Sequence, residues 1–426
     1  MNREEVSGNE GFFGLGLAPN LLGIVERLGF KNPTPIQQRA IPIAVEGKDV
    51  IGVAQTGTGK TLAFALPMIQ RLAATKGRGL ILLPTRELAL QVEETFQKMG
   101  RSIKLRTAVL IGGASMHMQK QAIKRDPHII VATPGRLIDH LEQGTVRLDR
   151  VNALVLDEAD RMFDMGFAPQ IKRILQEVPS ERQTMLFSAT MPQEIIHLAT
   201  RHMRLPVRVE VAQQGTTADK IDQEFFIVSK AAKMPLLESL LQAHRGTVLV
   251  FSRTKYGARN IAKHLNDKRY TAAELHSNRS LAQRKQALAG FKNGTYRVLV
   301  ATDIAARGID VKQIELVINF DLPDQTSDYV HRIGRTGRAG HSGHAISFAT
   351  PDQRGDMQAI ERFTRTKIRV TPLPSHIKAA APTSKSFDEP DRPYGTRNRV
   401  QGSSQGGGGR SGTSRSFHGR RSFGQR

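Results

Sequence analysis

Short runs of apolar residues, each followed by a turn and a helix-like stretch, recur along the first half of the chain. The first run lies at 49–54 and leads into a helical pattern at 62–72. Further apolar runs lie at 79–83, 128–131 and 153–156. Runs that are apolar at consecutive positions are typical of strands buried on both faces. Their alternation with helices predicts a parallel sheet covered by helices on both sides.

The same alternation restarts after a polar stretch at 213–220. Three further apolar runs follow, at 247–251, 297–300 and 316–318. We therefore predict two α/β domains, at 1–212 and 221–371, joined by a linker at 213–220. Beyond this point the pattern gives way to Pro, Ser, Gly and Arg. Residues 372–426 are predicted to be a disordered tail, because they cannot bury enough apolar surface to offset their conformational entropy.

The charge of the chain indicates the class of partner. Sixty-two Lys and Arg residues against thirty-nine Asp and Glu give a net charge of +23. From Arg392 to Arg426 there are eight arginines, nine glycines and no acidic residue, so the rest of the chain still carries +15. This excess favours a polyanionic partner, namely nucleic acid, over a small acidic substrate.

Composition also excludes several classes of protein. The chain has no cysteine, which excludes disulfides and thiolate zinc sites. No apolar stretch is long enough to span a bilayer, and the first ten residues are polar and acidic rather than signal-like. We expect a cytoplasmic protein without a membrane partner.

A glycine-rich segment follows the first predicted strand and ends in Gly-Lys-Thr. Gly57 and Gly59 let backbone N–H groups turn towards phosphate oxygens at the start of a helix. Lys60 is predicted to reach the β- and γ-phosphates of a nucleotide, and the Thr61 hydroxyl to bind Mg²⁺. The strict phosphate-loop pattern begins with glycine, whereas this segment begins with alanine. The predicted nucleotide-binding residues are Ala54, Gln55, Thr56, Gly57, Thr58, Gly59, Lys60 and Thr61.

A second candidate for chemistry is the acidic tetrapeptide 157–160, which ends the apolar run 153–156. Asp157 is the predicted partner of Mg²⁺, and Glu158 is predicted to orient and deprotonate the attacking water. An acidic tetrapeptide alone is more often a helix N-terminus. Its combination with a phosphate loop predicts a protein that binds and splits a nucleoside triphosphate.

With these residues placed, the chain resembles the DEAD-box ATP-dependent RNA helicases, most nearly the bacterial RhlE type, over about residues 12–370. The resemblance implies two tandem RecA-like domains that bind ATP and Mg²⁺ and act on single-stranded or short duplex RNA. It further implies that hydrolysis drives local separation of short duplexes with little sequence preference. We expect a monomer whose tail could recruit protein partners.

The resemblance assigns further residues to the nucleotide. Residues 29–37 are similar to the family's adenine-reading motif, in which Phe30 would stack on the base and the Gln37 amide would meet its edge. In the second domain Gly308 and Asp310 are similar to the residues that meet the ribose.

An arginine-rich motif at 331–338 resembles the family's arginine finger. It assigns Arg335 and Arg338 to the γ-phosphate, where a guanidinium group can stabilise the charge of the transition state. The resemblance also implies that Asp160, Ser188, Thr190 and His331 link the nucleotide state to RNA binding.

The RNA path is implied by loops that follow the predicted strands. Helix N-termini with nearby arginine and glycine suit backbone phosphates rather than base edges. The assigned residues are Pro84, Arg86, Gly113, Thr133, Arg136, Arg284 and Thr302. The chain departs from the family pattern at Leu281, where glutamine is frequent, and at Ser277, where glycine is common.

Three alternatives share these motifs. The chain could be an ATP-switched RNA clamp that does not unwind, or an RNA-annealing protein that acts through its arginine-rich tail. A DNA-translocating helicase is a third alternative.

Overall fold

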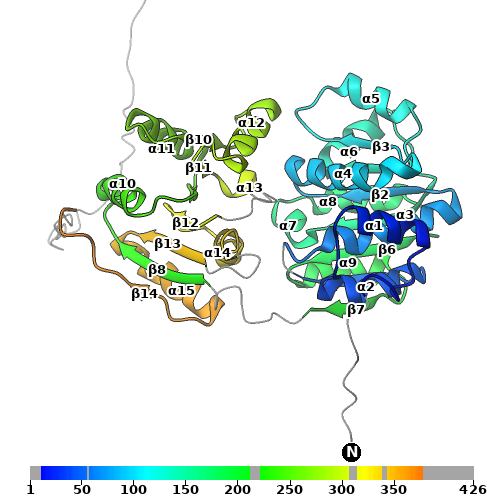
Figure 1. Ribbon diagram of the computed structural model, residues 1–426, viewed down its shortest axis with the longest axis horizontal. Coiled ribbons are helices and arrows are strands. Elements are labelled where there is room, and N and C mark those ends of the chain that lie inside the picture. Colours follow the sequence, from blue (N-terminus) through cyan, green and yellow to red (C-terminus); the bar gives the residue numbers. More distant parts are fainter. Residues whose placement is uncertain (1–10, 55–56, 212–220, 307–313, 338–342, 378–426) are drawn as a thin grey trace, which may run out of the picture. The chain divides into compact units, whose positions relative to one another are not determined.

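The computed structural model describes residues 11–54, 57–211, 221–306, 314–337 and 343–377. Within these ranges the strands form two seven-stranded sheets, and every strand pair is parallel (Figure 1). One sheet comes from the chain before residue 212 and the other from the chain after residue 220, here called the N-terminal and C-terminal domains. The prediction of two parallel α/β domains is confirmed. The predicted linker and tail residues 378–426 lie outside the described residues.

The N-terminal sheet has the strand order β3-β4-β2-β5-β6-β1-β7. Its strands are β1 (Val50–Val53), β2 (Arg78–Leu82), β3 (Thr107–Leu110), β4 (Ile129–Ala132), β5 (Val151–Asp157), β6 (Gln183–Ser188) and β7 (Val207–Glu210). Its helices are α1 (Pro19–Arg27), α2 (Pro35–Val45), α3 (Lys60–Thr75), α4 (Arg86–Gly100), η1 (Arg101–Ile103), α5 (Met116–Lys124), α6 (Pro134–Glu142), α7 (Ala159–Asp164), α8 (Ala168–Glu177) and α9 (Gln193–His202).

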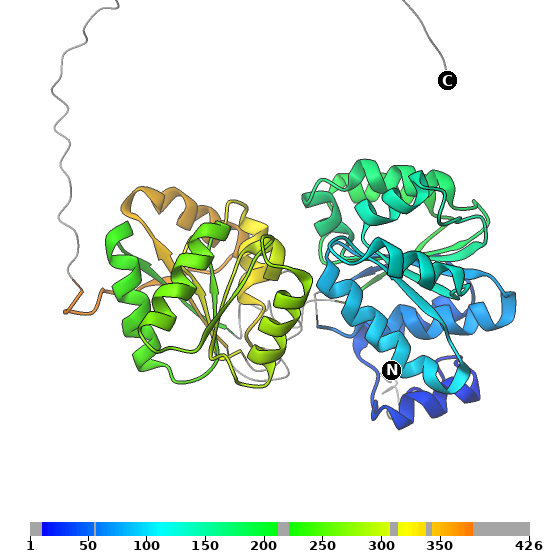
Figure 2. The same ribbon diagram turned by 90° about the horizontal axis from the view of Figure 1, so that it is seen from above.

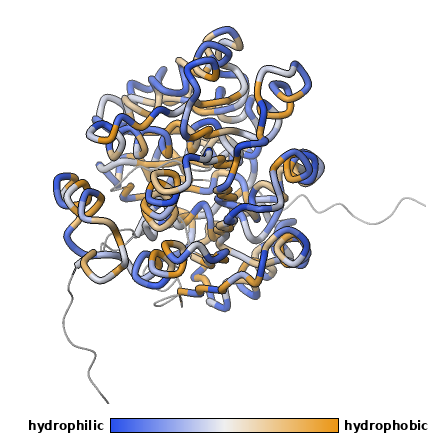
Figure 3. The backbone as a smooth tube through the Cα atoms, turned by 90° about the vertical axis from the view of Figure 1, so that its right-hand side faces the viewer, coloured by the Kyte–Doolittle hydropathy of each residue, from blue (hydrophilic) through white to orange (hydrophobic). Residues whose placement is uncertain are grey.

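Alternate residues of each N-terminal strand enter two separate apolar cores. On β5, Val155 packs with α1, α2, α3 and α4, whereas its neighbour Leu154 packs with α6, α7, α8 and α9. Both side chains are fully buried, as expected for a parallel sheet covered on both faces. Seen from above, the helices of this domain lie on the two sides of its sheet (Figure 2). Apolar and polar residues alternate along these helices, so that each can bury one side (Figure 3).

The C-terminal sheet repeats the arrangement with the order β10-β11-β9-β12-β13-β8-β14. Its strands are β8 (Ile221–Ile227), β9 (Val248–Phe251), β10 (Ala272–Leu275), β11 (Val298–Ala301), β12 (Leu316–Asn319), β13 (Gly343–Ala349) and β14 (Arg369–Val370). Its helices are η3 (Lys230–Ala232), α10 (Lys233–Ala243), α11 (Lys255–Asp267), α12 (Leu281–Lys292), α13 (Asp303–Ala306), α14 (Thr326–Ile333), η4 (Pro351–Gln353) and α15 (Arg354–Thr364). Helices α10 and α11 cover one face, and α12, α14 and α15 cover the other.

The C-terminal domain extends beyond the predicted boundary at 371. Leu373 and Ile377 both pack against the core that α10 and α11 cover. Residues 372–377 therefore belong to the folded domain rather than to the tail. In the ranges that the structure describes, no helix is long and apolar enough to cross a membrane.

Candidate nucleotide and RNA sites

Most predicted site residues of the N-terminal domain lie at the carboxyl ends of its strands or directly after them, whereas Phe30 and Gln37 precede the first strand. Because all strands of the sheet are parallel, these ends lie at one edge. The nucleotide candidates follow β1 and β5, whereas the RNA candidates follow β2, β3 and β4. The strand order places β3, β4 and β2 on one side of β5, and β6 and β1 on the other. The edge is thus divided into two adjacent halves, with β5 at their boundary.

The glycine-rich loop has the backbone that a phosphate site requires. Gly57 has φ 85° and Gly59 has φ 91°, both in the left-handed region that favours glycine. Gly59 is the N-cap of α3, so the first helical residue is Lys60. Ala54 stands where the strict pattern has glycine; it is buried in the core, and its N–H donates to the Ser188 carbonyl. Gln55 and Thr56 lie outside the described residues.

The environment of the Lys60 side chain indicates that this edge binds an anion. Lys60 is only 6% exposed, and its ammonium has no hydrogen-bond partner within the described residues. The Asp157 carboxylate lies 3.8 Å from its Nζ atom, which is an ion-pair distance but not a hydrogen bond. A buried ammonium without an acceptor is costly, and an anionic ligand would relieve that cost.

Asp157 ends β5, and Glu158 follows it with φ 52° at the N-cap of α7. Burial raises the pKa of Asp157 to about 6, against the opposing effect of Lys60. Burial also raises the pKa of Glu158, but Arg161 and Lys60 lower it further, so the net direction is downward. The Arg161 guanidinium donates to Glu158 Oε2 at 2.8 Å, and both side chains are almost fully buried. The arrangement therefore holds Glu158 ionised beside Asp157.

Gln37 connects the predicted adenine-reading segment to the phosphate loop. Its Nε2 donates to the Gly59 carbonyl at 2.9 Å, and its Oε1 accepts the Thr34 N–H at 2.9 Å. These bonds use one N–H of the Gln37 amide and one lone pair of its oxygen. A second N–H and a second lone pair remain for a ligand, and their binding to adenine stays a prediction. Phe30 is 40% exposed rather than part of the core, which leaves its ring available for stacking.

Asp160 joins the acidic segment to the end of β6. Its Oδ2 atom accepts hydrogen bonds from the Ala189 N–H, the Thr190 N–H and the Thr190 hydroxyl, at 3.1, 2.8 and 2.9 Å. The Asp160 N–H donates to Ser188 Oγ at 3.1 Å. Burial raises the pKa of Asp160, but Lys60 and the bonds from Thr190 lower it more. The structure thus brings together three of the four residues predicted to couple the two sites.

The RNA candidates of the N-terminal domain gather around one glycine loop. Arg86 begins α4 and follows Pro84, and its guanidinium lies against Gly113. A Cβ atom on Gly113 would stand 2.3 Å from Arg86 Nη1, and Gly113 has φ 76°. Arg136 donates to the Ala114 carbonyl at 3.2 Å from the first turn of α6, whose N-cap is Thr133. Two of these loops thus open helices, α4 and α6.

The remaining candidates lie in the C-terminal domain. Arg284 lies in the second half of the first turn of α12, and Thr302 joins β11 to α13. His331 lies in the last turn of α14, and Arg335 follows that helix with its Nε donating to the His331 carbonyl at 3.2 Å. Gly308, Asp310 and Arg338 lie outside the described residues.

Comparison with known proteins identifies the family. Residues 34–198 match the DEAD/DEAH box helicase domain, and residues 232–340 match the helicase conserved C-terminal domain. The chain is 45% identical over 357 residues to the DEAD-box ATP-dependent RNA helicase CshA of Geobacillus kaustophilus, which covers 83% of this chain and 76% of that protein. The chain belongs to the DEAD-box helicase family.

Solved structures of DEAD-box proteins share the fold. The chain is similar to Saccharomyces cerevisiae Dbp5 bound to RNA and ADP BeF3, with a TM-score of 0.76, 30% identity, and coverage of 85% of this chain and 95% of that chain. It is also similar to Mss116p bound to single-stranded RNA and AMP-PNP, with a TM-score of 0.79, 28% identity, and coverage of 88% and 82%. Two tandem RecA-like domains, as the resemblance implied, are thereby confirmed.

The DEAD-box motifs also contain residues that sequence reasoning missed. Arg332 is almost fully buried and donates twice to the Asp303 carboxylate, at 2.5 and 2.6 Å. It donates further to Asn319 Oδ1 and to the Asp321 carbonyl, at 3.2 and 2.6 Å. Arg332 therefore joins α14 to α13 and β12 and fixes the helix from which Arg335 projects. Its spacing in the arginine motif gave no sign that it differs from Arg335.

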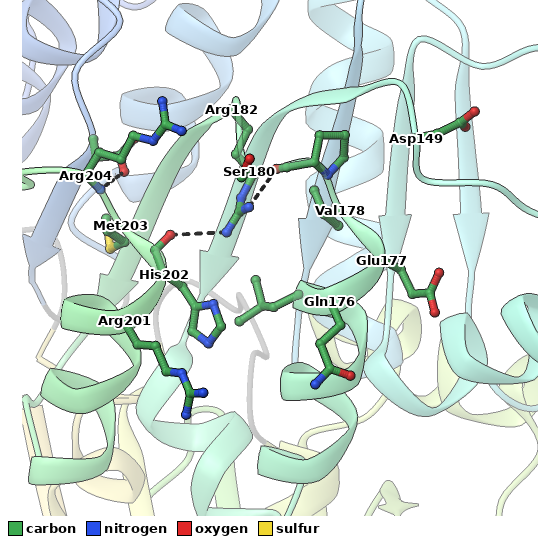
Figure 4. A pocket seen from close by; sticks show the side chains of 13 residues that line it. Asp149, Gln176, Glu177, Val178, Ser180, Arg182, Arg201, His202, Met203 and Arg204 are labelled. Atoms are coloured by element: carbon green, nitrogen blue, oxygen red, sulfur yellow. Dashed lines mark hydrogen bonds between the residues drawn. The ribbon is translucent and has the colours of Figure 1, made fainter.

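A separate pocket of about 600 Å³ lies at the opposite edge of the N-terminal sheet (Figure 4). Its lining residues precede strands or end helices, whereas the glycine-rich and acidic segments and the RNA candidate loops lie where strands end. Arg182 crosses it, donating to the Pro179 and His202 carbonyls at 2.7 and 3.1 Å. The lining mixes Asp149 and Glu177 with arginine and histidine, and none of the predicted site residues reaches it.

Proposed function

We propose that this chain is an ATP-dependent RNA helicase that hydrolyses ATP to separate short RNA duplexes locally. The observation that carries the proposal is the buried Lys60 ammonium at the end of a glycine loop, for which the described part of the chain supplies no hydrogen-bond acceptor. Triphosphate oxygens would supply that acceptor, and the relatives that share these motifs are named ATP-dependent RNA helicases.

Mg²⁺ fits the residues present. Mg²⁺ usually takes one or two protein oxygens, with substrate phosphates and waters as its other ligands. Asp157 at the end of β5 and Thr61 at the start of α3 would hold it here. Bound Mg²⁺ would neutralise charge on the phosphates.

The hydrolytic step is assigned to Glu158, which would take the proton of the attacking water. Its contact with Arg161 keeps the carboxylate ionised and fixes its direction. Arg335 and Arg338 would meet the charge that develops on the γ-phosphate. Such an arginine contributes about 10³ to 10⁵ in rate in related phosphoryl-transfer enzymes.

RNA is proposed to bind along the half of the edge that follows β2, β3 and β4, and to continue onto Arg284 and Thr302 of the C-terminal domain. Support comes from the convergence of Arg86 and Arg136 on the loop that holds Gly113. Contacts of this kind reach phosphates and carry no sequence information, so little sequence preference is expected.

Finer assignments rest on the resemblance. We propose an RhlE-type helicase that works as a monomer in the cytoplasm, although the relatives compared above carry the name CshA. Phe30 and Gln37 would select adenine, and Asp310 would meet the ribose. The arginine-rich tail would add sequence-independent RNA binding or recruit protein partners.

The deciding experiment is ATPase activity with and without single-stranded RNA. RNA should stimulate the wild-type protein, Lys60→Ala should abolish turnover, and Glu158→Gln should bind ATP and RNA without turnover. Equal stimulation by DNA would contradict the choice of RNA. Strand displacement on a short RNA duplex then separates a helicase from an ATP-switched clamp, which would show no displacement. Deleting residues 392–426 should leave ATPase and displacement intact if annealing by the tail is not the main activity.

A further inference from the structure

The glycine loop at the RNA half of the edge is held by a buried polar pair that the helicase motifs do not include. Gln119 lies on α5 with 5% of its surface exposed, and His140 lies on α6 fully buried. Neither belongs to the residues predicted from the sequence to bind RNA. Buried polar side chains are costly unless they are hydrogen-bonded, so their partners explain why they are there.

The Gln119 amide binds both ends of the loop. Its Oε1 accepts the Ile111 N–H at 3.2 Å, and its Nε2 donates to the Ile111 carbonyl at 3.1 Å and to the Ala114 carbonyl at 3.3 Å. Ile111 precedes the two glycines and Ala114 follows them. A single side chain therefore closes the neck of the loop that carries Gly113.

His140 fixes the orientation of that amide. Its Nε2 lies 3.2 Å from Gln119 Oε1, and its Nδ1 lies 2.8 Å from the Thr145 hydroxyl. Since Gln119 Oε1 can only accept, His140 must donate from Nε2. The Thr145 hydroxyl, which also lies 3.1 Å from the His140 carbonyl, has one proton to share between that carbonyl and Nδ1. Burial and nearby Arg136 lower the pKa of His140, in agreement with a neutral ring that has one donor and one acceptor.

Two proposed phosphate-binding arginines depend on the same loop. Arg136 donates to the Ala114 carbonyl, which is the acceptor that Gln119 also uses. The Arg86 guanidinium lies against Gly113 so closely that a Cβ atom there would collide with it. A displacement of the loop would therefore move both guanidinium groups and the Gly113 N–H together.

We propose that Gln119, oriented by His140, is a positioning residue for RNA: it holds the 111–114 loop so that Gly113, Arg86 and Arg136 present a single phosphate-binding surface. This rests on the proposed RNA site of the N-terminal domain. Gln119 itself touches no RNA in this assignment, and the nucleotide half of the edge does not depend on it.

The test is RNA-stimulated ATPase of full-length Gln119→Met, which keeps the size of the side chain and removes its hydrogen bonds. The RNA concentration that gives half-maximal stimulation should rise about tenfold, as expected when positioning worth about one buried hydrogen bond is lost. The kcat at saturating RNA and the KM for ATP should stay within about twofold. The matched control is Gln121→Met, an exposed glutamine of the same helix, which should leave all three values unchanged.

A second variant guards against loss of folding. Gln119→Glu keeps the shape of the side chain and the acceptor at Oε1. It replaces the NH₂ group by a second oxygen, which would face the carbonyls of Ile111 and Ala114. It should therefore weaken RNA binding as Gln119→Met does. In the double variant Gln119→Met/Gly113→Ala, the RNA concentration for half-maximal stimulation should rise by less than the product of the two single increases, because both changes act on one loop.

The outcomes separate the two proposals. If Gly113→Ala and Arg86→Ala weaken RNA while both Gln119 variants bind it normally, the positioning role is wrong and the RNA site stands. If Gly113→Ala and Arg86→Ala also bind RNA normally, the RNA site itself is wrong. A fall in melting temperature together with an altered KM for ATP, without a selective loss of RNA affinity, would assign Gln119 a purely structural role and overturn the proposal.

Discussion

Asp160→Asn replaces one carboxylate oxygen by an NH₂ group without changing the shape of the side chain. Asp160 Oδ2 accepts three hydrogen bonds, from Ala189 and Thr190, and Oδ1 accepts the Arg161 N–H at 3.0 Å. All four of these partners are donors. An amide NH₂ placed at either oxygen position would therefore face a donor, and the less costly arrangement turns it towards Arg161.

The size of the effect follows from these bonds. In the better arrangement one bond is lost and leaves a buried donor unsatisfied, which costs about 1–3 kcal/mol. The three bonds at Oδ2 remain but lose their charge assistance, which makes such bonds about twice as strong. The lowered pKa of Asp160 shows that its partners outweigh the cost of burying the charge. We therefore expect a net loss of about 2–4 kcal/mol in the stability of the N-terminal domain.

Thermal unfolding and RNA-stimulated ATPase measure this loss. A domain of this size should melt about 5–10 °C lower, and stimulation by RNA should fall because the link from α7 to the end of β6 is weakened. Glu177→Gln, which changes an exposed carboxylate on helix α8 of the same domain, is the control and should behave as wild type. If Asp160→Asn melts within about 2 °C of wild type and retains full RNA stimulation, the hydrogen-bond account of this link is refuted.

Three further predictions concern other parts of the fold. Gly59→Ala should weaken binding of a non-hydrolysable ATP analogue at least tenfold, as measured by calorimetry. The new Cβ would lie 2.4 Å from Gln37 Nε2, and the backbone φ of 91° is unfavourable for alanine. An unchanged affinity for the analogue would contradict this prediction. Arg332→Met should lower the melting temperature by an amount equivalent to about 1–3 kcal/mol, since it removes the donor of the partly buried Asp303 carboxylate and of the buried Asn319 Oδ1, whereas exposed Arg362→Met should have no effect. The pKa of Asp321 is raised by burial but lowered more by its lysine partner, so it lies below the unfolded value. Its stabilisation is thus complete above the unfolded pKa of about 4 and is lost as pH falls through the folded value, and Asp321→Asn should flatten the acid limb of a stability profile.

Much of the architecture could be predicted because it depends on continuous apolar runs. The run at 153–156 is fully buried on both faces of β5, as its pattern indicated. Strand β6 was not predicted, since Gln183 and Thr184 at its start are polar yet buried. Gln183 donates to the carbonyls of Ala44 and Lys48, and the Thr184 N–H donates to Asp49. Their partners are more than one hundred residues away in sequence, and no local period reveals them.

The chemistry of the site was predictable only in part, for a related reason. Motif residues such as Lys60 and Asp157 could be placed from spacing and resemblance, because strand ends in a parallel sheet meet at one edge. The residues that hold these motif side chains in position could not be predicted in this way. Arg161 is an ordinary helical arginine in sequence, and only the fold places its guanidinium 2.8 Å from Glu158. Gln119 is one of two glutamines on a short polar helix, and only the fold buries it.

If nucleotide and RNA bind at the proposed sites, the order of the strands would let them affect one another through few atoms. Strand β5 pairs with β2 on one side and with β6 on the other, with Leu82 and Leu186 both opposite Leu156. The proposed RNA loops follow β2, β4 and β3, and the proposed phosphate loop follows β1, on the far side of β6. Glu158 and Asp160 are two residues apart at the start of α7, so a movement of Glu158 towards an attacking water must also move the carboxylate that binds Ala189 and Thr190. Under the proposed function, the coupling would therefore depend on the first turn of one short helix and would need no chain of distant contacts.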